Sequence, residues 1–454
     1  MNLKDDFILS QLNEGYLVGG SVRDALMGKP FVDRDIAIKN AEFFAKKMAE
    51  KFNATFIELD PEYKIYRLVL EDKVNYLDIS EIQGADILED LSRRDFTMNA
   101  IAINLTNNEI IDPYNGQADI KNEVIQHIKE SNFSDDPLRI LRAFRFASTT
   151  GFELSKKTKA CIKKHKDLLF IPAKERINYE LMKLFGGSKC SKVLLEMDEF
   201  GILEELFPQV KEMKKVTPNT HHHLDLFHHV VETVRNIEEL YLNATEAEQE
   251  HLDTIDFGGF PRINHVKLAG FLHDIGKFST WTIEESGRHR FIKHDDVGAK
   301  ICVPYLRNMK FSKKQIEYIS TMIKTHIYPS NVIDAPDLND KVMMRYLRKM
   351  GRNVIDNIIL AKADRLSARG EAITEEIIMA NLSGLDKLLN FYFEKRDTLK
   401  PLPKLLDGIE IMKIKGLKQS PILGEIITAL KEAQINGEIN TKEEAINFVI
   451  EYKI

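Results

Sequence analysis

Two aspartates at alternate positions, Asp33 and Asp35, lead into the apolar run Ile36–Ile38. On a strand, side chains at i and i+2 point to the same face, so both carboxylates can bind one pair of divalent ions. Two such ions, about 4 Å apart, activate an attacking hydroxyl and stabilise a leaving pyrophosphate. The pair alone is also typical of a surface loop, so the hypothesis needs support from neighbouring motifs.

A glycine turn, Gly19-Gly20-Ser21-Val22-Arg23, precedes the two aspartates. Small residues before a helix let backbone N–H groups approach phosphates closely. Arg23 adds a forked donor suited to a triphosphate. The turn and the aspartates together favour a nucleotide site over an ordinary loop.

Two further motifs follow, Arg93-Arg94-Asp95-Phe96-Thr97-Met98-Asn99 and Asp136-Pro137-Leu138-Arg139-Ile140-Leu141-Arg142. In a helix, Asp136, Arg139 and Arg142 share one face, with apolar residues on the other positions. One carboxylate and two guanidinium groups can hydrogen-bond the edge of a base. The alternative is an amphipathic helix that is N-capped by Asp136 and carries surface ion pairs.

Taken in this order and spacing, the motifs resemble the family of class II tRNA nucleotidyltransferases and bacterial poly(A) polymerases. The resemblance covers about residues 15–187 and implies a polymerase-β-like head followed by helical neck, body and tail. Asp33 and Asp35 would bind two Mg²⁺ ions. The residues that would bind the nucleotide are Gly20, Arg23, Arg94, Asp95, Asp135, Asp136, Arg139, Arg142 and Arg145. Asp135 stands where the family has Glu, and its shorter side chain weakens that one assignment.

A third carboxylate is usual in this superfamily, and Asp78 in the strand-like run Val74–Ile79 fits that position. A surface aspartate on an edge strand is the alternative. The segment from Ile79 to Ser92 leaves no room for the long flexible loop of the enzymes that build the whole CCA end. The resemblance therefore favours addition of A over complete CCA synthesis.

A second constellation lies in the helical part of the chain, around His273-Asp274. With His229 upstream and Asp364 downstream, the order resembles that of the HD phosphohydrolase superfamily. The resemblance implies a divalent metal site, with His228 as the alternative to His229, and His294 and His326 lie between the ligands. The centre is either a phosphohydrolase, acting for example on a 2′,3′-cyclic or terminal phosphate of RNA, or a degenerate fold that helps to hold RNA.

The elements that must position these residues change character along the chain. The first hundred residues predict a small α/β domain, with strands at 15–18, 35–38, 55–59, 65–70 and 74–79 and a helix at 41–52. After Asp136 the pattern is helical, apart from a small hairpin within 287–293. His221-His222-His223 is interpreted as a polar helix start. The fold class is α+β, divided into a head (1–130), a neck (131–210), an HD domain (211–385) and a helical tail (386–454).

Composition narrows the class of protein. The net charge is −6, but residues 131–190 carry 13 Lys and Arg against 6 Asp and Glu, and residues 387–418 carry 8 against 4. These two basic zones suit RNA phosphates, with a solvated helix surface as the alternative. The tail lysines Lys413, Lys415 and Lys418 could bind the phosphates of a tRNA. The 3 Cys form no CxxC pair, there is no signal-peptide pattern, and no apolar run approaches the roughly 20 residues that span a bilayer. A cytoplasmic protein without a membrane partner is expected.

The sequence thus predicts an enzyme that transfers nucleotides from ATP, and from CTP for a complete CCA end, to tRNA. A poly(A) polymerase is the alternative in the same class. An HD phosphohydrolase whose head only binds nucleotide is the alternative in a different class. The pattern does not fix the oligomeric state or the identity of the metal in the HD domain.

Overall fold

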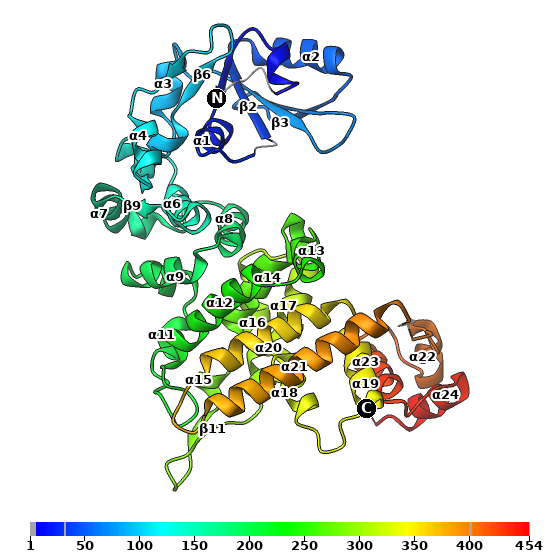
Figure 1. Ribbon diagram of the computed structural model, residues 1–454. Helices are drawn as coiled ribbons and strands as arrows, with labels where there is room; N and C mark the ends of the chain where they lie inside the picture. The colour runs from blue at the N-terminus through cyan, green and yellow to red at the C-terminus, as the bar shows by residue number, and fades with distance from the viewer. Residues whose placement is uncertain (1–5, 31–32, 399–401, 454) are drawn as a thin grey trace. The chain divides into compact units, whose positions relative to one another are not determined.

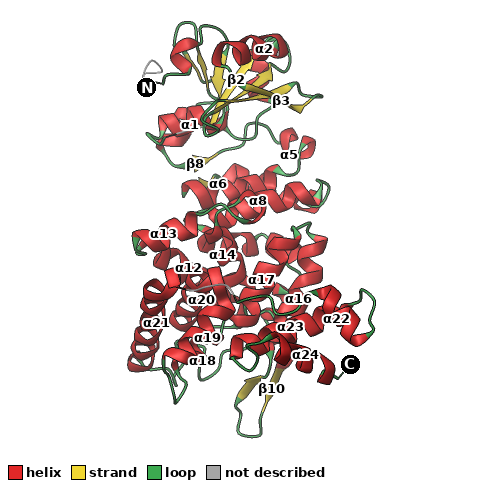
Figure 2. Cartoon of the chain, turned by 90° about the vertical axis from the view of Figure 1, so that its right-hand side faces the viewer, coloured by secondary structure: helices red, strands yellow, loops and turns green. Residues whose placement is uncertain are grey.

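The computed structural model describes residues 6–30, 33–398 and 402–453 (Figures 1 and 2). The chain forms two compact units, Met1–Leu206 and Phe207–Ile454. The first combines a sheet with helices, and the second is helical apart from one small hairpin. The predicted α+β fold class, with a nucleotidyltransferase-like head followed by helical regions, is confirmed.

A seven-stranded mixed sheet forms the centre of the head, in the order β3-β4-β5-β2-β1-β6-β7. Its strands are β1 (Tyr16–Val18), β2 (Asp33–Ile38), β3 (Thr55–Asp60), β4 (Ile65–Val69), β5 (Tyr76–Glu81), β6 (Ala102–Asn104) and β7 (Ile110–Ile111). The central pair β2–β5 is parallel, and the other neighbours are antiparallel. The five predicted strands are all present, with ends shifted by one or two residues.

Helix α2 (Ala41–Phe52) packs on strands β2, β3, β4 and β5 and spans the predicted residues. It buries Phe44, Ala45 and Met48, which recur at helical spacing, and ends at Asn53 in the left-handed region. Three short helices, α1 (Gly20–Leu26), α3 (Ile87–Ser92) and α4 (Gly116–Lys121), complete the head. A core cluster beside the glycine turn is formed by Val18, Ala37, Ile82, Ile87, Leu91, Ala100 and Ala102.

The rest of the first unit is mainly helical. Its elements are β8 (Val124–Ile125), α5 (Ser131–Asp135), α6 (Arg139–Thr150), β9 (Glu153–Leu154), α7 (Lys156–His165), α8 (Lys174–Gly186), α9 (Cys190–Glu199) and α10 (Ile202–Leu206). Helix α6 packs on α8 and α9. It begins at Arg139, just after Asp136, whose backbone is extended and whose carboxylate accepts a 3.3 Å hydrogen bond from the Leu138 N–H. Asp136 therefore supports the first turn, as the Asp-Pro pair predicts.

The second unit is built around helix α14 (Arg262–Leu272), in which every residue is buried. Helices α12, α13, α17 and α20 contact it. The other elements are α11 (Val210–Met213), α12 (Leu226–Leu242), α13 (Glu246–Asp253), α15 (Lys277–Thr280), α16 (His294–Asn308), α17 (Lys313–Thr325), α18 (Tyr328–Ile333), α19 (Asp340–Met350), α20 (Val354–Ser367) and α21 (Glu375–Lys395).

The predicted hairpin is present but starts earlier, with β10 (Trp281–Ile283) paired to β11 (His289–Phe291). It extends beyond the helices of its unit in both views (Figures 1 and 2).

The end of the chain forms a small helical group of its own. Helices α22 (Gly408–Lys415), α23 (Pro421–Asn436) and α24 (Lys442–Glu451) surround a separate cluster that includes Ile411, Ile426 and Val449. Helix α21 runs through residue 385, so the separate core lies C-terminal to the predicted start of the tail. Within the described ranges, no helix is both long and apolar enough to cross a bilayer.

Candidate nucleotide pocket and metal centre

The glycine turn holds the end of β1 against the first aspartates. Gly19 has a φ of +70°, and a side chain there would lie 3.1 Å from both the Asp35 carboxylate and the Arg94 guanidinium. Ser21 donates to the Val18 carbonyl at 3.1 Å and accepts from the Asp35 N–H at 3.2 Å. Only glycine fits a turn in this conformation at this distance from a carboxylate and a guanidinium.

Three carboxylates meet on neighbouring strands. Asp33 and Asp35 lie on β2, and Asp78 on β5 is in direct register with Asp35 across the parallel pair. The Asp78 carboxylate accepts two hydrogen bonds from Arg67, at 2.7 and 2.6 Å. Burial, then the charge of Asp78, with a further contribution from Asp33, raises the pKa of Asp35 to about 6.

This crowding fits a site for divalent cations. Carboxylates that raise one another's pKa would be stabilised in their charged form by bound cations, which prefer oxygen ligands. Asp33 and Asp35 line an open pocket, whereas Asp78 is not among its lining residues and is held by Arg67. The geometry therefore suits Asp33 and Asp35 as ligands and gives Asp78 a supporting place.

The pocket beside these aspartates has a volume of about 640 Å³. It is polar and rich in arginine, and it brings together nearly all the predicted nucleotide-binding residues. Those that line it are Gly20, Arg23, Asp33, Asp35, Arg94, Asp95, Asp136, Arg139, Arg142 and Arg145. Asp135 instead lines an adjoining cavity of about 740 Å³, which shares Arg94, Asp136 and Arg139 with the first.

Two of the pocket arginines, on helix α6, are fixed by buried carboxylates. Arg142 contacts Asp95 at 2.8 and 2.5 Å and Glu180 of α8 at 3.2 Å, and Arg145 lies 2.8 Å from Glu180. Burial opposes ionisation of Asp95, but the Arg142 charge and a hydrogen bond from Asn99 hold the pKa of Asp95 well below its usual range. The Arg145 guanidinium also lies 3.8 Å from the centre of the Phe146 ring.

Arg139 joins the base of α6 to the head. Its guanidinium donates to the carbonyls of Arg93, at 2.5 Å, and Arg94, at 3.3 Å. Asp136 pairs with Arg176 of α8 at 3.0 Å. The predicted base-reading residues therefore lie at the junction of the head strands and the α6–α8 pair.

The sequence analysis missed one residue that lines the pocket, Asn99, and one that holds two of its arginines, Glu180. Asn99 accepts from Arg23 at 2.8 Å and lies within the Arg-Arg-Asp motif, so the motif could have indicated it. Glu180 is 3% exposed and bridges Arg142 and Arg145. Its only signal is a glutamate among apolar neighbours on α8, such as Leu181.

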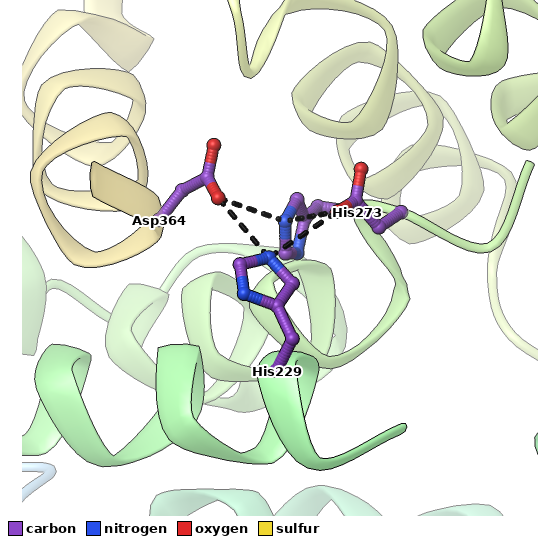
Figure 3. Close-up of side chains that lie close together, drawn as sticks. His229, His273 and Asp364 are labelled. Carbon is purple, nitrogen blue, oxygen red and sulfur yellow. Dashed lines mark ion pairs between the residues drawn. The ribbon is translucent and has the colours of Figure 1, made fainter. Parts of the chain in front are cut away.

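The second unit brings a different set of groups together. His229 lies on α12, His273 and Asp274 directly follow α14, and Asp364 lies on α20. Figure 3 shows the His229, His273 and Asp364 side chains pointing toward one another. His229 Nε2 lies 3.2 Å from Asp364 Oδ1 and 3.3 Å from Asp274 Oδ2, and one ligand atom from each of the four residues lies within 4.8 Å of the others.

Hydrogen-bonding capacity indicates that these four residues fit a cation. The Nε2 atoms of His229 and His273 and both oxygens of Asp274 are buried and make no hydrogen bond of normal geometry. His273 Nδ1 is occupied, since it lies 2.7 Å from the Gly270 carbonyl and therefore donates to it. Its free Nε2 faces the carboxylates, which is the usual tautomer of a metal-binding histidine.

A second group shares Asp274. His294, at the start of α16, lies 3.3 Å from Asp274 Oδ1, and His326, just after α17, lies 3.6 Å from the same atom. The sequence analysis noted both histidines but did not assign them as ligands. Their approach depends on Gly276, where an added Cβ would lie 2.0 Å from the His294 carbonyl oxygen. The arrangement offers two adjacent cation positions bridged by one carboxylate.

The neighbouring histidines differ from expectation. His221-His222-His223 does not begin a helix, because α12 starts at Leu226 after the capping residue Asp225. The His222 ring instead packs against His229 at 4.5 Å, and His222 Nε2 faces the Lys277 ammonium at 3.2 Å. His228 is exposed and pairs with Asp225 at 2.7 Å, away from the cluster.

The sheet with its paired aspartates, the glycine turn and the arginine pocket define a nucleotidyltransferase, to which a helical HD unit is joined. Sequence profiles agree. The poly A polymerase head domain matches residues 15–126, the "Probable RNA and SrmB- binding site of polymerase A" matches 151–214, and the HD domain matches 226–369.

Two relatives that match over nearly their whole length identify the family of this chain. An A-adding tRNA nucleotidyltransferase of Deinococcus radiodurans is 30% identical over 440 residues, covering 95% of this chain and 94% of the relative. A CC-adding tRNA nucleotidyltransferase of Thermus thermophilus is 29% identical, covering 99% and 96%. The chain belongs to the tRNA nucleotidyltransferase family, whose reaction is template-independent addition of nucleotides to the tRNA 3′ end.

A solved structure shares the fold. The Thermotoga maritima CCA-adding enzyme complexed with tRNA aligns with a TM-score of 0.55 at 22% identity, covering 96% of this chain and 90% of that one.

Proposed function

We propose that this chain adds only one kind of nucleotide, C or A, and does not build the complete CCA end. The observation that carries the proposal is the short connection 82–86 between β5 and α3. Its ends, Ile82 and Ile87, are buried in the head core. Gln83 N–H donates to Asp90 at 3.0 Å, and Asp86 caps α3. A connection held in this way supplies no mobile loop that could reshape the pocket between additions.

The base-reading groups are held as firmly as the connection. Arg139 is tied to the carbonyls of Arg93 and Arg94, and Arg142 is tied to Asp95 and Glu180. Cytosine and adenine present different donors and acceptors on their edges. A fixed set of side chains therefore suits one of the two bases. The sequence resemblance favours A, and the full-length CC-adding relative makes C the alternative.

The test is end-product sequencing. tRNA transcripts lacking CCA, or ending in C or CC, are incubated with ATP, CTP or both. We expect incorporation of a single nucleotide type, either up to two C residues or one A on the CC end. Complete CCA synthesis on a transcript lacking all three residues contradicts the proposal. Long A tails on generic RNA would instead identify a poly(A) polymerase.

We also propose that Asp33 and Asp35 bind two Mg²⁺ ions. When bound, these ions would supply the charge that activates the tRNA hydroxyl and stabilises pyrophosphate. The chain's own groups do the positioning, since Arg23, Arg142 and Arg145 line the pocket where a triphosphate and base would lie. The buried cysteines and a tRNA substrate suit a cytoplasmic location.

A second activity is favoured by the metal centre of the HD unit. We propose that His229, His273, Asp274 and Asp364 hold a divalent metal for phosphate-ester hydrolysis, with His294 and His326 completing a second position. The buried ligand atoms without hydrogen bonds support this proposal.

The test of this activity is His273→Ala. We expect the variant to lose bound metal, measured by elemental analysis, and to lose hydrolysis of RNA 2′,3′-cyclic or terminal phosphates, while it keeps nucleotide addition. Simultaneous loss of both activities in a folded variant counts against two independent sites.

A further inference from the structure

The hairpin β10–β11 has one face made of aromatic and apolar side chains. Trp281 is paired with Phe291, and Ile283 with His289, so these four residues lie on the same face. The ring centres of Trp281 and His289 are 5.4 Å apart, and the Trp281 indole N–H donates to His289 Nδ1 at 3.2 Å. Ile283 is 58% exposed, although it is apolar. The opposite face is polar and includes the pair Arg290–Glu284.

This face begins at the metal centre. The Lys277 ammonium lies 2.5 Å from Asp274 and 5.4 Å from the centre of the Phe291 ring. The Phe291 carbonyl is 2.8 Å from His294 Nδ1, so it receives the proton of that nitrogen. His229, Lys277 and Phe291 also line one small cavity. A series of side-chain contacts therefore links the candidate cation ligands to Phe291 on this face of the hairpin.

Several positively charged side chains act on His221, and one of them, Lys277, contacts Asp274. Burial, followed by the charges of Arg288, Lys277 and Arg365, lowers the pKa of His221, so each of these three cations acts on the same imidazole. Arg365 Nε is buried and has no hydrogen-bond partner. A ligand with anionic groups would satisfy both the cations and the unpartnered guanidinium nitrogen.

We propose that the hairpin is a stacking platform for unpaired RNA that presents a 3′-terminal phosphate to the HD metal centre. Bases would stack on Trp281 and His289, and the terminal phosphate would lie near Lys277 and Arg365. The proposal rests on the phosphohydrolase function above and narrows its RNA substrate to an unpaired strand that ends in a 3′ phosphate. Flat aromatic side chains beside a cationic group are the pattern that binds single strands without sequence preference.

Trp281 is the only tryptophan of the chain, so its fluorescence reports directly on this face. The full-length protein, freed of metal to prevent turnover, is titrated with a six-nucleotide single-stranded RNA that carries a 3′ phosphate. We expect quenching of the emission, with weaker binding of the same RNA ending in a 3′ hydroxyl. 3′-CMP, which offers one base, should bind weakest.

Variants on the two faces of the hairpin sharpen the test. We expect His289→Ala to weaken RNA binding about tenfold, because one stacking contact is lost. Thr282→Ala, on the opposite face of the same hairpin, should leave the affinity unchanged. Arg288→Ala should lower the salt dependence of log K by roughly 0.7, the contribution of one phosphate contact on a single strand.

Equal affinities of His289→Ala and Thr282→Ala would overturn the proposal, as would RNA binding, detected by anisotropy of a labelled strand, that leaves Trp281 emission unchanged. Turnover measurements test phosphate hydrolysis at the HD centre separately from RNA binding on the hairpin. In metal-loaded protein, His289→Ala should raise the KM for the RNA phosphate and leave kcat for p-nitrophenyl phosphate unchanged. Absence of any hydrolysis with intact quenching would reject the phosphohydrolase function and keep the RNA platform.

Discussion

The arginines of the candidate nucleotide pocket and the proposed ligands of the HD centre differ in how their buried charge is balanced. In the pocket, Arg142 lies between Asp95 and Glu180, and Arg145 lies against Glu180. In the HD centre, the carboxylates of Asp274 and Asp364 face one ammonium, that of Lys277, and the Nε2 atoms of His229 and His273. In the first arrangement guanidinium charges face carboxylates of the protein, whereas in the second imidazole nitrogens and carboxylates together offer lone pairs that suit a cation.

This difference has consequences for stability and for chemistry. A pocket whose side chains already hold one another is preorganised, so substrate binding needs little rearrangement. A centre that needs a cation gains stability when the cation binds. We therefore expect the first unit to respond mainly to changes in its own residues and the second to respond to metal supply. Four experiments, from the largest expected effect to the smallest, test this division.

The largest effect is expected for Asp35→Asn. Loss of one of the paired carboxylates removes several kcal/mol of transition-state stabilisation, so single-turnover nucleotide addition should fall by about 10³-fold or more. Asp72→Asn, in the exposed turn before β5, is the matched control and should add nucleotides normally. Nucleotide addition by Asp35→Asn within tenfold of the parent chain would remove Asp35 from the metal site. Hydrolysis at the HD centre should be unaffected in both variants.

Glu180→Ala tests the internal balance of the pocket. The variant leaves the buried Arg145 without its carboxylate, whereas the partly exposed Arg142 keeps Asp95, so we expect a loss of about 3 kcal/mol of unfolding free energy, the lower end of the range for a broken buried pair. Glu153→Ala removes a surface pair with Lys192 and should cost less than about 1 kcal/mol. Urea unfolding of both variants gives the comparison. Equal stabilities would show that the arginines rely on other partners.

Metal removal tests the second unit. A cation at 100 times its dissociation constant stabilises the folded state by about 2.7 kcal/mol, so chelation should lower the stability of the HD unit by that order. Calorimetry with and without chelator should shift the transition of this unit. The transition assigned to the first unit by the Glu180→Ala shift should stay in place. A shift of both transitions, or of neither, contradicts the division.

The smallest effect concerns acid. The pKa of His265 on α14 is lowered to about 4, mainly by burial of the imidazole and also by the charge of Arg262. The Pro261 carbonyl and the carboxylates of Asp356 and Asp256 have smaller effects that raise this pKa. The unfolded chain takes up this proton near pH 6.5 and the folded chain only near pH 4, so stability should decrease as pH falls through that window. His265→Gln should reduce the difference in unfolding free energy between pH 7 and pH 5. An unchanged difference would show that other groups cause the acid sensitivity.

Much of the head could be predicted because its chemistry lies in short motifs. Alternation on β2 places Asp33 and Asp35 on one face, and the glycine turn stands beside them in sequence. Glu180 could not be found in this way, because its meaning depends on the packing of α8 against α6. The sequence pattern of an apolar helix face that contains one glutamate does not show which residues that glutamate contacts.

The HD centre shows the same limit over longer distances. His-Asp adjacency indicated His273 and Asp274, whereas His294 and His326 lie 32 positions apart and meet only through the packing of α16 on α17. The triple histidine was interpreted as a helix start, but Asp225 caps the helix instead, which leaves His222 free to pack on His229. Spacing along one helix could not reveal either contact.

Gly276 has no side chain, so the loop after α14 can lie directly against the start of α16. A single methyl group there would collide with the His294 carbonyl oxygen at 2.0 Å and separate the two backbones. We therefore expect Gly276→Ala to move His294 away from Asp274 and to reduce the two proposed cation positions to one. In this proposal, the number of bound metal ions depends on the ligands and also on the distance between the loop after α14 and the start of α16.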